Sequence, residues 1–450
     1  MDVVLKPVAP ATSRRLGHRD VLAIALPITI SNATVPLIGF ADAAVIGQLG
    51  EAHLLGAVAL SANIFNFIYF LFGFLRMGTT GLTAQAVGAA NSSEIAANLI
   101  RPLMGAAIIG SVLVALQALI IYLALAAFSP SERVATAAKV YFDIRIWAAP
   151  AGLANFALIG WFIGLGRAAV TFYLQLLLNG LNILLAIAFV AIFEWGVGGV
   201  ALAALIAEYI AAAAGLVIAL REMRRQGSLT SRADVLNAGR LHKLFDVSRD
   251  IMIRTLCIQA AFAFFVAQGA RTDDLTLAAN AVLYSMMMVA IYMIDGFAYA
   301  AETLVGQAVG AQRRDMYGQA IRLTTLWAFG LSVILAIVLL AGGGLIVDFV
   351  TTNVSVREAS HSFLMWAALV PLTSVWCFQL DGIFIGATDT RTMRNMMLWA
   401  VLAYFAAWYG LHPLFGNHGL WMAVHVFFLA RAVALGSQLP ELARKSFPAI

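Results

Sequence analysis

Charge is scarce in this sequence. Only 11% of its 450 residues are Asp, Glu, Lys or Arg, while 62% are hydrophobic. A typical soluble domain carries about 25% charged residues. The mean hydropathy is +0.90. This composition excludes an ordinary water-soluble domain, and we therefore expect an integral membrane protein surrounded by the lipid bilayer.

Cysteine and the motifs of soluble enzymes are also rare or missing. The two cysteines, Cys257 and Cys377, both lie in apolar runs and predict no disulfide framework. The sequence contains no HExxH, GxxxxGK[ST] or GxSxG motif and no Cys/His cluster with metal-ligand spacing. We expect no enzyme, no metal and no cofactor. Without a nucleotide site, we expect no ATP hydrolysis within this chain, so an ion gradient would have to supply any energy that it uses.

What the sequence does contain is a series of long apolar segments. Twelve of them approach or exceed the roughly 20 residues that cross a bilayer. They cover about 20–48, 53–75, 98–128, 138–165, 168–193, 198–221, 242–269, 276–300, 317–346, 358–386, 393–415 and 418–438. Basic residues concentrate in alternate connections, which predicts that both termini are cytoplasmic. Basic loops of this kind also explain the isoelectric point near 9.3 without a nucleic-acid partner.

The two halves of the chain repeat one another. Gln-Ala-Val-Gly-Ala at 85–89 recurs at 307–311, an offset of 222 (307 minus 85), and Phe-Ile-Gly at 162–164 recurs at 384–386. Six spans per repeat is an even number, so both halves enter the membrane in the same direction. This predicts an all-α fold of two six-helix bundles related by a pseudo-twofold axis along the membrane normal, with a binding cavity between them. The expected domains are 1–222 and 241–450, joined by a cytoplasmic linker at 223–240.

A single carboxylate, Asp42, interrupts the first apolar span. A carboxylate in a membrane segment is costly and marks a candidate functional site. Burial disfavours its charged form, so such a group can bind and release a proton near neutral pH. Pro27 and Pro36 in the same span each remove a backbone hydrogen bond and favour a bend. The alternative is a structural carboxylate paired with Arg76.

A polar stripe follows the fifth span. Gln175, Asn179 and Asn182 have the spacing i, i+4, i+7 and share one helix face. We expect Asn155 of the fourth span to join Asn179 and Asn182 in a proton- or cation-coupling site around Asp42, and Gln175 to line the substrate cavity. The alternative is that these amides only form hydrogen bonds between helices, as is common in membranes.

The eighth span carries a different face, on which methionine, aromatic and acidic residues align. Its members are Met288, Tyr292, Asp295, Tyr299 and Glu302. Aromatic rings, thioethers and acids suit lipophilic cations, so this face, with Asp381 of the tenth span, is a candidate substrate cavity. The alternative is that Arg254 neutralises one of the acids of the eighth span and the aromatic rings are core. For Glu208 of the sixth span, we favour a structural role.

Segments along nearly the whole chain resemble the multidrug and toxic compound extrusion (MATE) transporters, and among them the DinF-like branch. They are Leu26-Pro27, Val35-Pro36-Leu37 with Asp42, FLRMGTTGLTAQA at 74–86, AEY at 207–209, SRDIM at 248–252, DGFAYA at 295–300 and DGIFIGAT at 381–388. The resemblance implies cation-driven export of small organic cations or amphiphiles by alternating access, from the inner membrane of a bacterium. We expect a monomer. The resemblance also assigns Asp42 to the cation site of the first bundle and Pro27 to a helix bend.

The sequence departs from this family at one position. The family's fifth-helix asparagine falls on Asn182, but many relatives have an aspartate four residues later, where this chain has Ala186. A Na⁺ site needs several hard oxygens, whereas a proton needs one basic group, so H⁺ is the expected coupling ion and Na⁺ the alternative. A second alternative is a lipid-linked saccharide flippase of the same superfamily, whose cavity would be lined with arginines. A receptor without transport activity fits the twofold repeat poorly.

Overall fold

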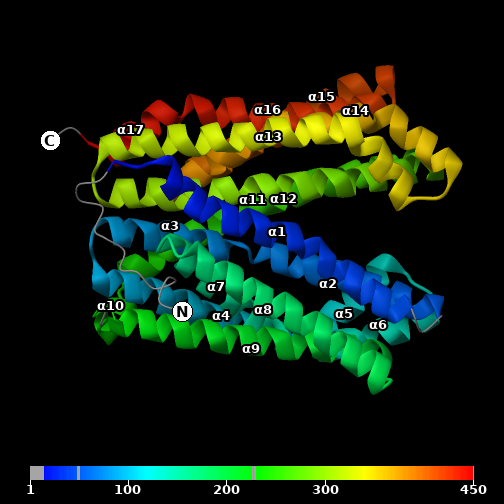
Figure 1. Cartoon of the computed structure of the whole chain (residues 1–450), viewed down its shortest axis with the longest axis horizontal. Helices are drawn as coiled ribbons and strands as arrows, with labels where there is room; N and C mark the ends of the chain where they lie inside the picture. The colour runs from blue at the N-terminus through cyan, green and yellow to red at the C-terminus, as the bar shows by residue number, and fades with distance from the viewer. Residues whose placement is uncertain (1–14, 48–50, 226, 228–229, 449–450) are drawn as a thin grey trace. The chain divides into compact units, whose positions relative to one another are not determined.

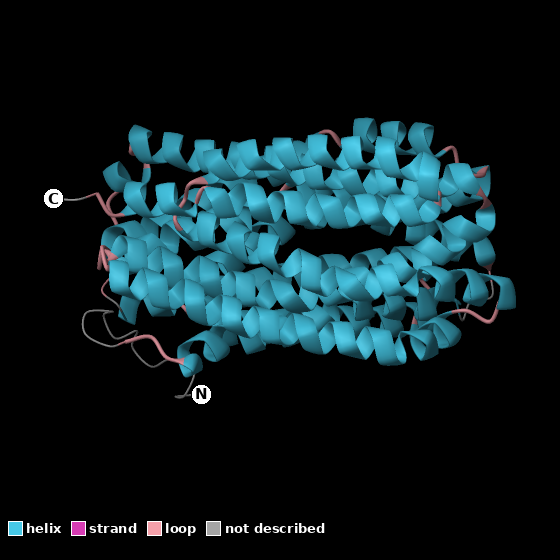
Figure 2. Ribbon diagram, turned by 90° about the horizontal axis from the view of Figure 1, so that it is seen from above, coloured by secondary structure: helices cyan, strands magenta, loops and turns pink. Residues whose placement is uncertain are grey.

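The computed structural model describes residues 15–47, 51–225, 227 and 230–448. For residues 35–44 it describes the backbone alone. α-Helices make up nearly all of this part of the chain, and no strand occurs within it (Figure 2). The predicted all-α class is therefore confirmed.

The described residues form two compact units. The N-terminal unit comprises 33–244 and the C-terminal unit comprises 15–32 with 245–448. Helix α1 (His18–Gly47) contributes its first half to the C-terminal unit and its second half to the N-terminal unit. Figure 1 colours the chain along its length and labels the helices.

The N-terminal unit continues from α1 through nine further α-helices. They are α2 (Ala52–Leu71), α3 (Phe74–Gly88), α4 (Ser92–Ala115), α5 (Gln117–Phe128), α6 (Glu132–Arg145), α7 (Ala149–Gly164), α8 (Ala168–Ile187), α9 (Gly196–Arg225) and α10 (Arg232–Val235). A 3₁₀ turn, Ile146–Ala148, joins α6 to α7, and a π-helical turn, Ala188–Ile192, extends α8. The short helix α10 falls within the predicted linker. It is fixed to α4 by Arg101, which donates to the carbonyl oxygens of Val235 at 3.0 Å and Asp234 at 2.6 Å.

The C-terminal unit is built from longer helices. They are α11 (Ala238–Thr272), α12 (Asp274–Gly310), α13 (Arg314–Val350), α14 (Val354–Gly386), α15 (Thr390–Phe415), α16 (Asn417–Ser437) and α17 (Leu439–Ser446). The start of α1 packs on α12, where Thr29 Oγ1 donates to the Met293 carbonyl oxygen at 3.2 Å and Asn32 Nδ2 to that of Tyr292 at 3.1 Å. Gly296 permits this approach, because a Cβ there would collide with Thr29.

The predicted spans agree with the helices. Among the described residues, eleven helical stretches are long and apolar enough to cross a membrane, and they match the second to twelfth predicted spans. Helix α1 occupies the position of the first. The second span runs beyond its predicted end at residue 75, through α3 to Gly88, and the third is divided between α4 and α5. These are differences of boundary, which hydropathy alone defines loosely.

The sequence repeat corresponds to a repeated helix contact. In the N-terminal unit, a Cβ on Gly164 of α7 would lie 2.7 Å from the carbonyl oxygen of Thr80 on α3. In the C-terminal unit, a Cβ on Gly386 of α14 would lie 2.6 Å from the carbonyl oxygen of Glu302 on α12. The two contacts occupy equivalent positions of the repeat, because Gly386 lies 222 residues after Gly164 and Glu302 lies 222 residues after Thr80. Glycine at this position lets the two backbones approach closely in each unit.

The Gln-Ala-Val-Gly-Ala repeats end two equivalent helices. After α3, Ala90 has a positive φ of 51°, and the Asn91 amide donates to the Ala86 carbonyl oxygen at 3.0 Å. After α12, Gln312 has a φ of 54°, and the Arg313 amide donates to the Ala308 carbonyl oxygen at 3.0 Å. This is the Schellman pattern of helix termination. The repeated motif thus specifies a helix end in both units.

Candidate functional site

In the N-terminal unit, Glu208 of α9 is the centre of a polar cluster. Asn155 of α7 donates through Nδ2 to Glu208 Oε2 at 2.7 Å and to the Glu208 carbonyl oxygen at 3.0 Å. Arg145 of α6 lies 3.5 Å from Oε1. The Arg145 guanidinium also lies over the rings of Phe65 and Tyr69, 5.5 and 5.7 Å from their centroids. The carboxylate, the amide and the stacked cation join α2, α6, α7 and α9.

This cluster gives Asn155 a partner that the sequence did not identify. Its amide nitrogen is directed to Glu208, and the pair spans 53 residues of sequence. The favoured structural role of Glu208 agrees with this geometry, because the carboxylate connects three helices. The assignment of Asn155 to a coupling site around Asp42 stays a prediction.

The polar stripe on α8 is largely buried. Asn179 and Asn182 are 6% and 5% exposed, and Gln175 is half-buried. Asn179 Nδ2 donates to Thr34 Oγ1 at 3.1 Å, which connects α8 to the second half of α1. Asn182 Oδ1 is buried and has no hydrogen-bond partner within the part of the chain that the structure describes. Ala186, one turn further along α8, is 1% exposed.

The side chains of Asp42 and Pro36 lie outside the described residues. The backbone places both on α1, eight and two residues beyond Thr34. At 1.5 Å per residue, Asp42 lies about 12 Å along the helix from the hydroxyl that Asn179 contacts. Pro27 lies within the same helix, in its first half. The roles of these three residues stay predictions.

In the C-terminal unit, Asp381 of α14 lies between two arginines. Arg431 of α16 donates through a terminal nitrogen to Asp381 Oδ2 at 2.5 Å, and Arg254 of α11 donates to the same oxygen. All three residues are buried, Asp381 with 3% of its surface exposed. The Arg431 guanidinium also lies over the rings of Phe378 and Phe427, at 5.2 and 5.3 Å. One buried carboxylate thus joins two guanidiniums from different helices.

Asp381 and Arg254 were identified as candidate residues from the sequence, but Arg431 was not. Arg254 forms an ion pair with Asp381 of α14. The predicted alternative, in which Arg254 neutralises an acid of the eighth span, stays a prediction. Arg431 was detectable in principle, because a charge inside an apolar span requires a partner. The buried Gln379 was also missed. Neither its Oε1 nor its Nε2 has a hydrogen-bond partner among the described residues.

The methionine, aromatic and acidic residues predicted to share one face of the eighth span lie on α12. We call this face, which is partly exposed, the α12 stripe. Met288, Tyr292, Asp295 and Tyr299 are half-buried, whereas Glu302 is buried near the contact with α14. Asp295 interacts electrostatically with both Tyr292 and Arg431. This exposure suits residues that line a cavity, but their role in substrate binding stays a prediction. Within the described residues, no three His, Cys, Asp or Glu side chains converge in a way that would hold a metal ion.

Comparison with known proteins agrees with this architecture. The MatE family model matches residues 27–188 and 251–408. The DNA damage-inducible protein F of Escherichia coli is 38% identical over 418 residues, which cover 92% of this chain and 90% of that protein. A probable multidrug resistance protein NorM from Deinococcus radiodurans is 27% identical, covering 92% and 93% of the two chains.

Solved structures show the same fold. A multidrug resistance MATE family transporter of the MOP superfamily, in an outward-facing conformation, superposes with a TM-score of 0.83 at 18% identity, covering 94% of this chain and 96% of that one. A MATE structure in the bent conformation gives a TM-score of 0.86 at 18% identity, covering 95% and 96%. These matches confirm the predicted twelve transmembrane helices in two bundles. The chain belongs to the MatE family, the multidrug and toxic compound extrusion transporters.

Proposed function

We propose that this transporter is an H⁺-coupled antiporter that exports cationic or amphipathic organic compounds by alternating access. Membership of a family of multidrug efflux transporters supports the general activity. The choice of ion rests on the chemistry of the two units. The observation that carries it is the pairing of Asp381 with both Arg254 and Arg431.

The pairing of Asp381 disfavours a Na⁺ site at this carboxylate. Two guanidiniums already bind Oδ2, so a sodium ion there would meet two positive charges within a buried site. A Na⁺ ion would have to displace a guanidinium, and an unpaired buried arginine is costly. Asp381 therefore contributes to holding α11, α14 and α16 together, and it is a poor cation ligand.

The N-terminal unit also offers few hard ligands along α8. Asn182 supplies a buried amide oxygen, but Ala186 supplies a methyl group where many relatives have a carboxylate. A dehydrated Na⁺ ion needs several oxygens, whereas a proton needs only one basic group. Asp42 on α1 supplies that group. We assign proton binding to Asp42, with Asn179 and Asn182 as its polar surroundings and Pro27 as the bend that responds.

The flippase alternative is disfavoured by the buried arginines. Arg254 and Arg431 are both bound to Asp381, and Arg145 is bound to Glu208. A cavity for a pyrophosphate-linked substrate needs guanidiniums that are available to the ligand. Na⁺-coupled antiport stays the second candidate, since Asn182 retains an oxygen with no partner among the described residues.

A direct test is proton release from the detergent-solubilised protein. An organic cation such as ethidium is added in weakly buffered solution, and the pH change is recorded with an indicator dye. Exchange of proton for substrate predicts acidification by the parent protein and none by Asp42→Asn. Saturable ethidium binding without acidification by the parent would contradict the proposal.

A further inference from the structure

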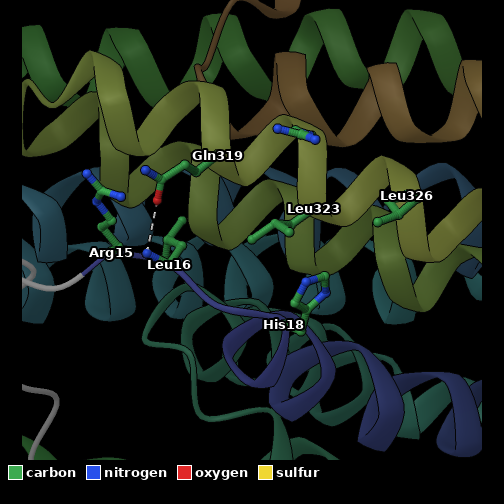
Figure 3. Close-up of a pocket in the computed structure, with 7 residues that line it drawn as sticks. Arg15, Leu16, His18, Gln319, Leu323 and Leu326 are labelled. Carbon is green, nitrogen blue, oxygen red and sulfur yellow. Dashed lines mark hydrogen bonds between the residues drawn. The ribbon is translucent and has the colours of Figure 1, made fainter.

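A cavity of about 410 Å³ lies between the start of α1 and the second to fourth turns of α13 (Figure 3). It belongs entirely to the C-terminal unit. Its polar lining consists of Arg15, His18, Gln319 and Arg322. We call it the α1–α13 pocket. Nothing in the antiport proposal uses these residues.

The pocket is positively charged. Arg15 and Arg322 are exposed and lie 307 residues apart in sequence, and both line the same cavity. Within the described residues, neither forms an ion pair, and no carboxylate lines the cavity. The partly exposed Arg313 behaves differently, because it binds Asp315 at 2.7 Å. The two uncompensated guanidiniums favour an anionic ligand.

The neutral polar residues of the pocket, Gln319 and His18, also offer N–H donors. The Leu16 amide donates to Gln319 Oε1 at 3.1 Å, and Trp327 Nε1 donates to His18 Nδ1 at 3.0 Å. A backbone amide and an indole nitrogen can only donate. Gln319 Oε1 and His18 Nδ1 therefore act as acceptors, which leaves Nε2 of each residue as a donor. Two guanidiniums and two N–H donors match the oxygens of a phosphate group.

The remaining lining is apolar and partly exposed. Leu16, Leu323 and Leu326 complete the cavity, and Leu326 is 56% exposed. The next residue on α13, Trp327, is half-buried, as expected for a tryptophan at a membrane interface. Arg322 is one turn before Leu326, and its long side chain can extend towards the headgroup region. The pocket thus combines phosphate donors with apolar surface at the end of a membrane span.

We propose that the α1–α13 pocket binds the phosphodiester headgroup of an anionic phospholipid, with the leucines in contact with its acyl chains. The leaflet is the one at the N-terminal ends of α1 and α13, which the distribution of basic residues predicts to be cytoplasmic. Anionic lipids are abundant at such surfaces, and basic pockets between helices recognise their headgroups. A bound lipid would connect the start of α1 to α13.

The test measures lipid binding to the purified full-length protein in detergent by native mass spectrometry. Dioleoyl phosphatidylglycerol is titrated against the parent and against the double variant Arg15→Gln/Arg322→Gln. Each arginine near a charged surface contributes about fivefold to affinity, so the double variant should bind about 25-fold more weakly. The control is Arg314→Gln/Arg391→Gln, which removes two exposed arginines at the same predicted side of the C-terminal unit but outside the pocket. It should bind within about twofold of the parent.

Three results would overturn the proposal. The first is parent-like phosphatidylglycerol binding by the pocket variant, and the second is an equal loss by the control. The third concerns the source of the phosphate: inorganic phosphate that displaces the lipid at equimolar concentration would show a soluble-anion site. Dioleoyl phosphatidylcholine serves as the zwitterionic probe and should bind more weakly than phosphatidylglycerol. Thermal melts of both double variants should match the parent, because all four side chains are exposed.

Discussion

The two units use the same helix contact but different buried chemistry. Gly160 and Gly382, 222 residues apart, both lie where a neighbouring backbone leaves no room for a Cβ. The residues just before them are Ile159 in the N-terminal unit and Asp381 in the C-terminal unit. The repeat therefore preserved the packing positions and changed an adjacent polar position. The two halves need not share one ion-coupling chemistry.

The difference extends to how each unit neutralises a carboxylate. Glu208 is held by an amide at 2.7 Å and by one arginine at 3.5 Å. Asp381 is held by two arginines on one oxygen. Two guanidiniums bind the same oxygen of Asp381, which opposes cation exchange at that carboxylate. This contrast is why we assign coupling to the N-terminal unit.

The largest effect is expected from Asp42→Asn. The amide resembles a permanently protonated carboxyl, so the variant should fold but lose proton-coupled efflux. Efflux of a fluorescent cation from cells with equal amounts of parent and variant protein measures this. Asp381→Ala serves as the comparison, provided that enough folded protein is obtained. Parent-like efflux by Asp42→Asn would remove the proposed difference between the units.

The next largest effect concerns stability in the C-terminal unit. Asp381→Asn leaves two buried guanidiniums without their shared counterion, and breaking a buried ion pair costs about 3–5 kcal/mol. Glu208→Gln should cost less, because Asn155 is neutral and Arg145 keeps its contacts with two aromatic rings. Thermal unfolding in detergent compares the two variants. Equal losses would mean that the two carboxylates are held equally strongly.

The features that the sequence predicted are those set by residues close together in the chain. The twelve spans and the repeat follow from local composition and from identical short segments, and both agree with the helices. The Phe-Ile-Gly repeats at 162–164 and 384–386 marked equivalent positions, but they did not show that their glycines pack against a neighbouring helix. The break between α4 and α5 at Leu116 lies in a run that is apolar apart from Gln117, so hydropathy gave no clear signal for it.

The candidate sites were less predictable because they depend on pairing between distant helices. Arg254 and Asp381 are 127 residues apart, and Arg431 and Asp381 are 50 apart. A charge inside an apolar span predicts that a partner exists but not which one. The α1–α13 pocket was beyond prediction for the same reason, since it unites Arg15 with Arg322.

A gain of function is expected at residue 186. Ala186→Asp adds a carboxylate one turn from Asn182, on a buried face of α8. If this face and Asp42 share one cavity, the added oxygen should make transport depend on Na⁺. Uptake by inside-out vesicles with and without a Na⁺ gradient measures the change, and Ala186→Asn controls for size. Unchanged Na⁺ dependence in a folded Ala186→Asp protein would show that α8 does not line the ion site.

The smallest effects should come from the α12 stripe. Tyr292→Ala and Asp295→Ala are expected to change substrate preference by a few-fold while leaving substrate-triggered proton release in place. Their partial exposure and alignment with Met288 and Tyr299 support this expectation. Dose–response curves for several organic cations of different size test it, with Val289→Ala, exposed on another face of α12, as the control. Identical profiles for all variants would assign the stripe to helix packing.

We propose that coupling depends on proton exchange at Asp42 in the N-terminal unit. Neither unit requires Na⁺ in this mechanism. The most direct test uses purified protein in liposomes, with dye uptake driven by a pH gradient at equal Na⁺ or by a Na⁺ gradient at equal pH. We expect uptake that follows the pH gradient, ignores the Na⁺ gradient and is absent in Asp42→Asn. Uptake driven by Na⁺ at constant pH in the parent protein would contradict this mechanism.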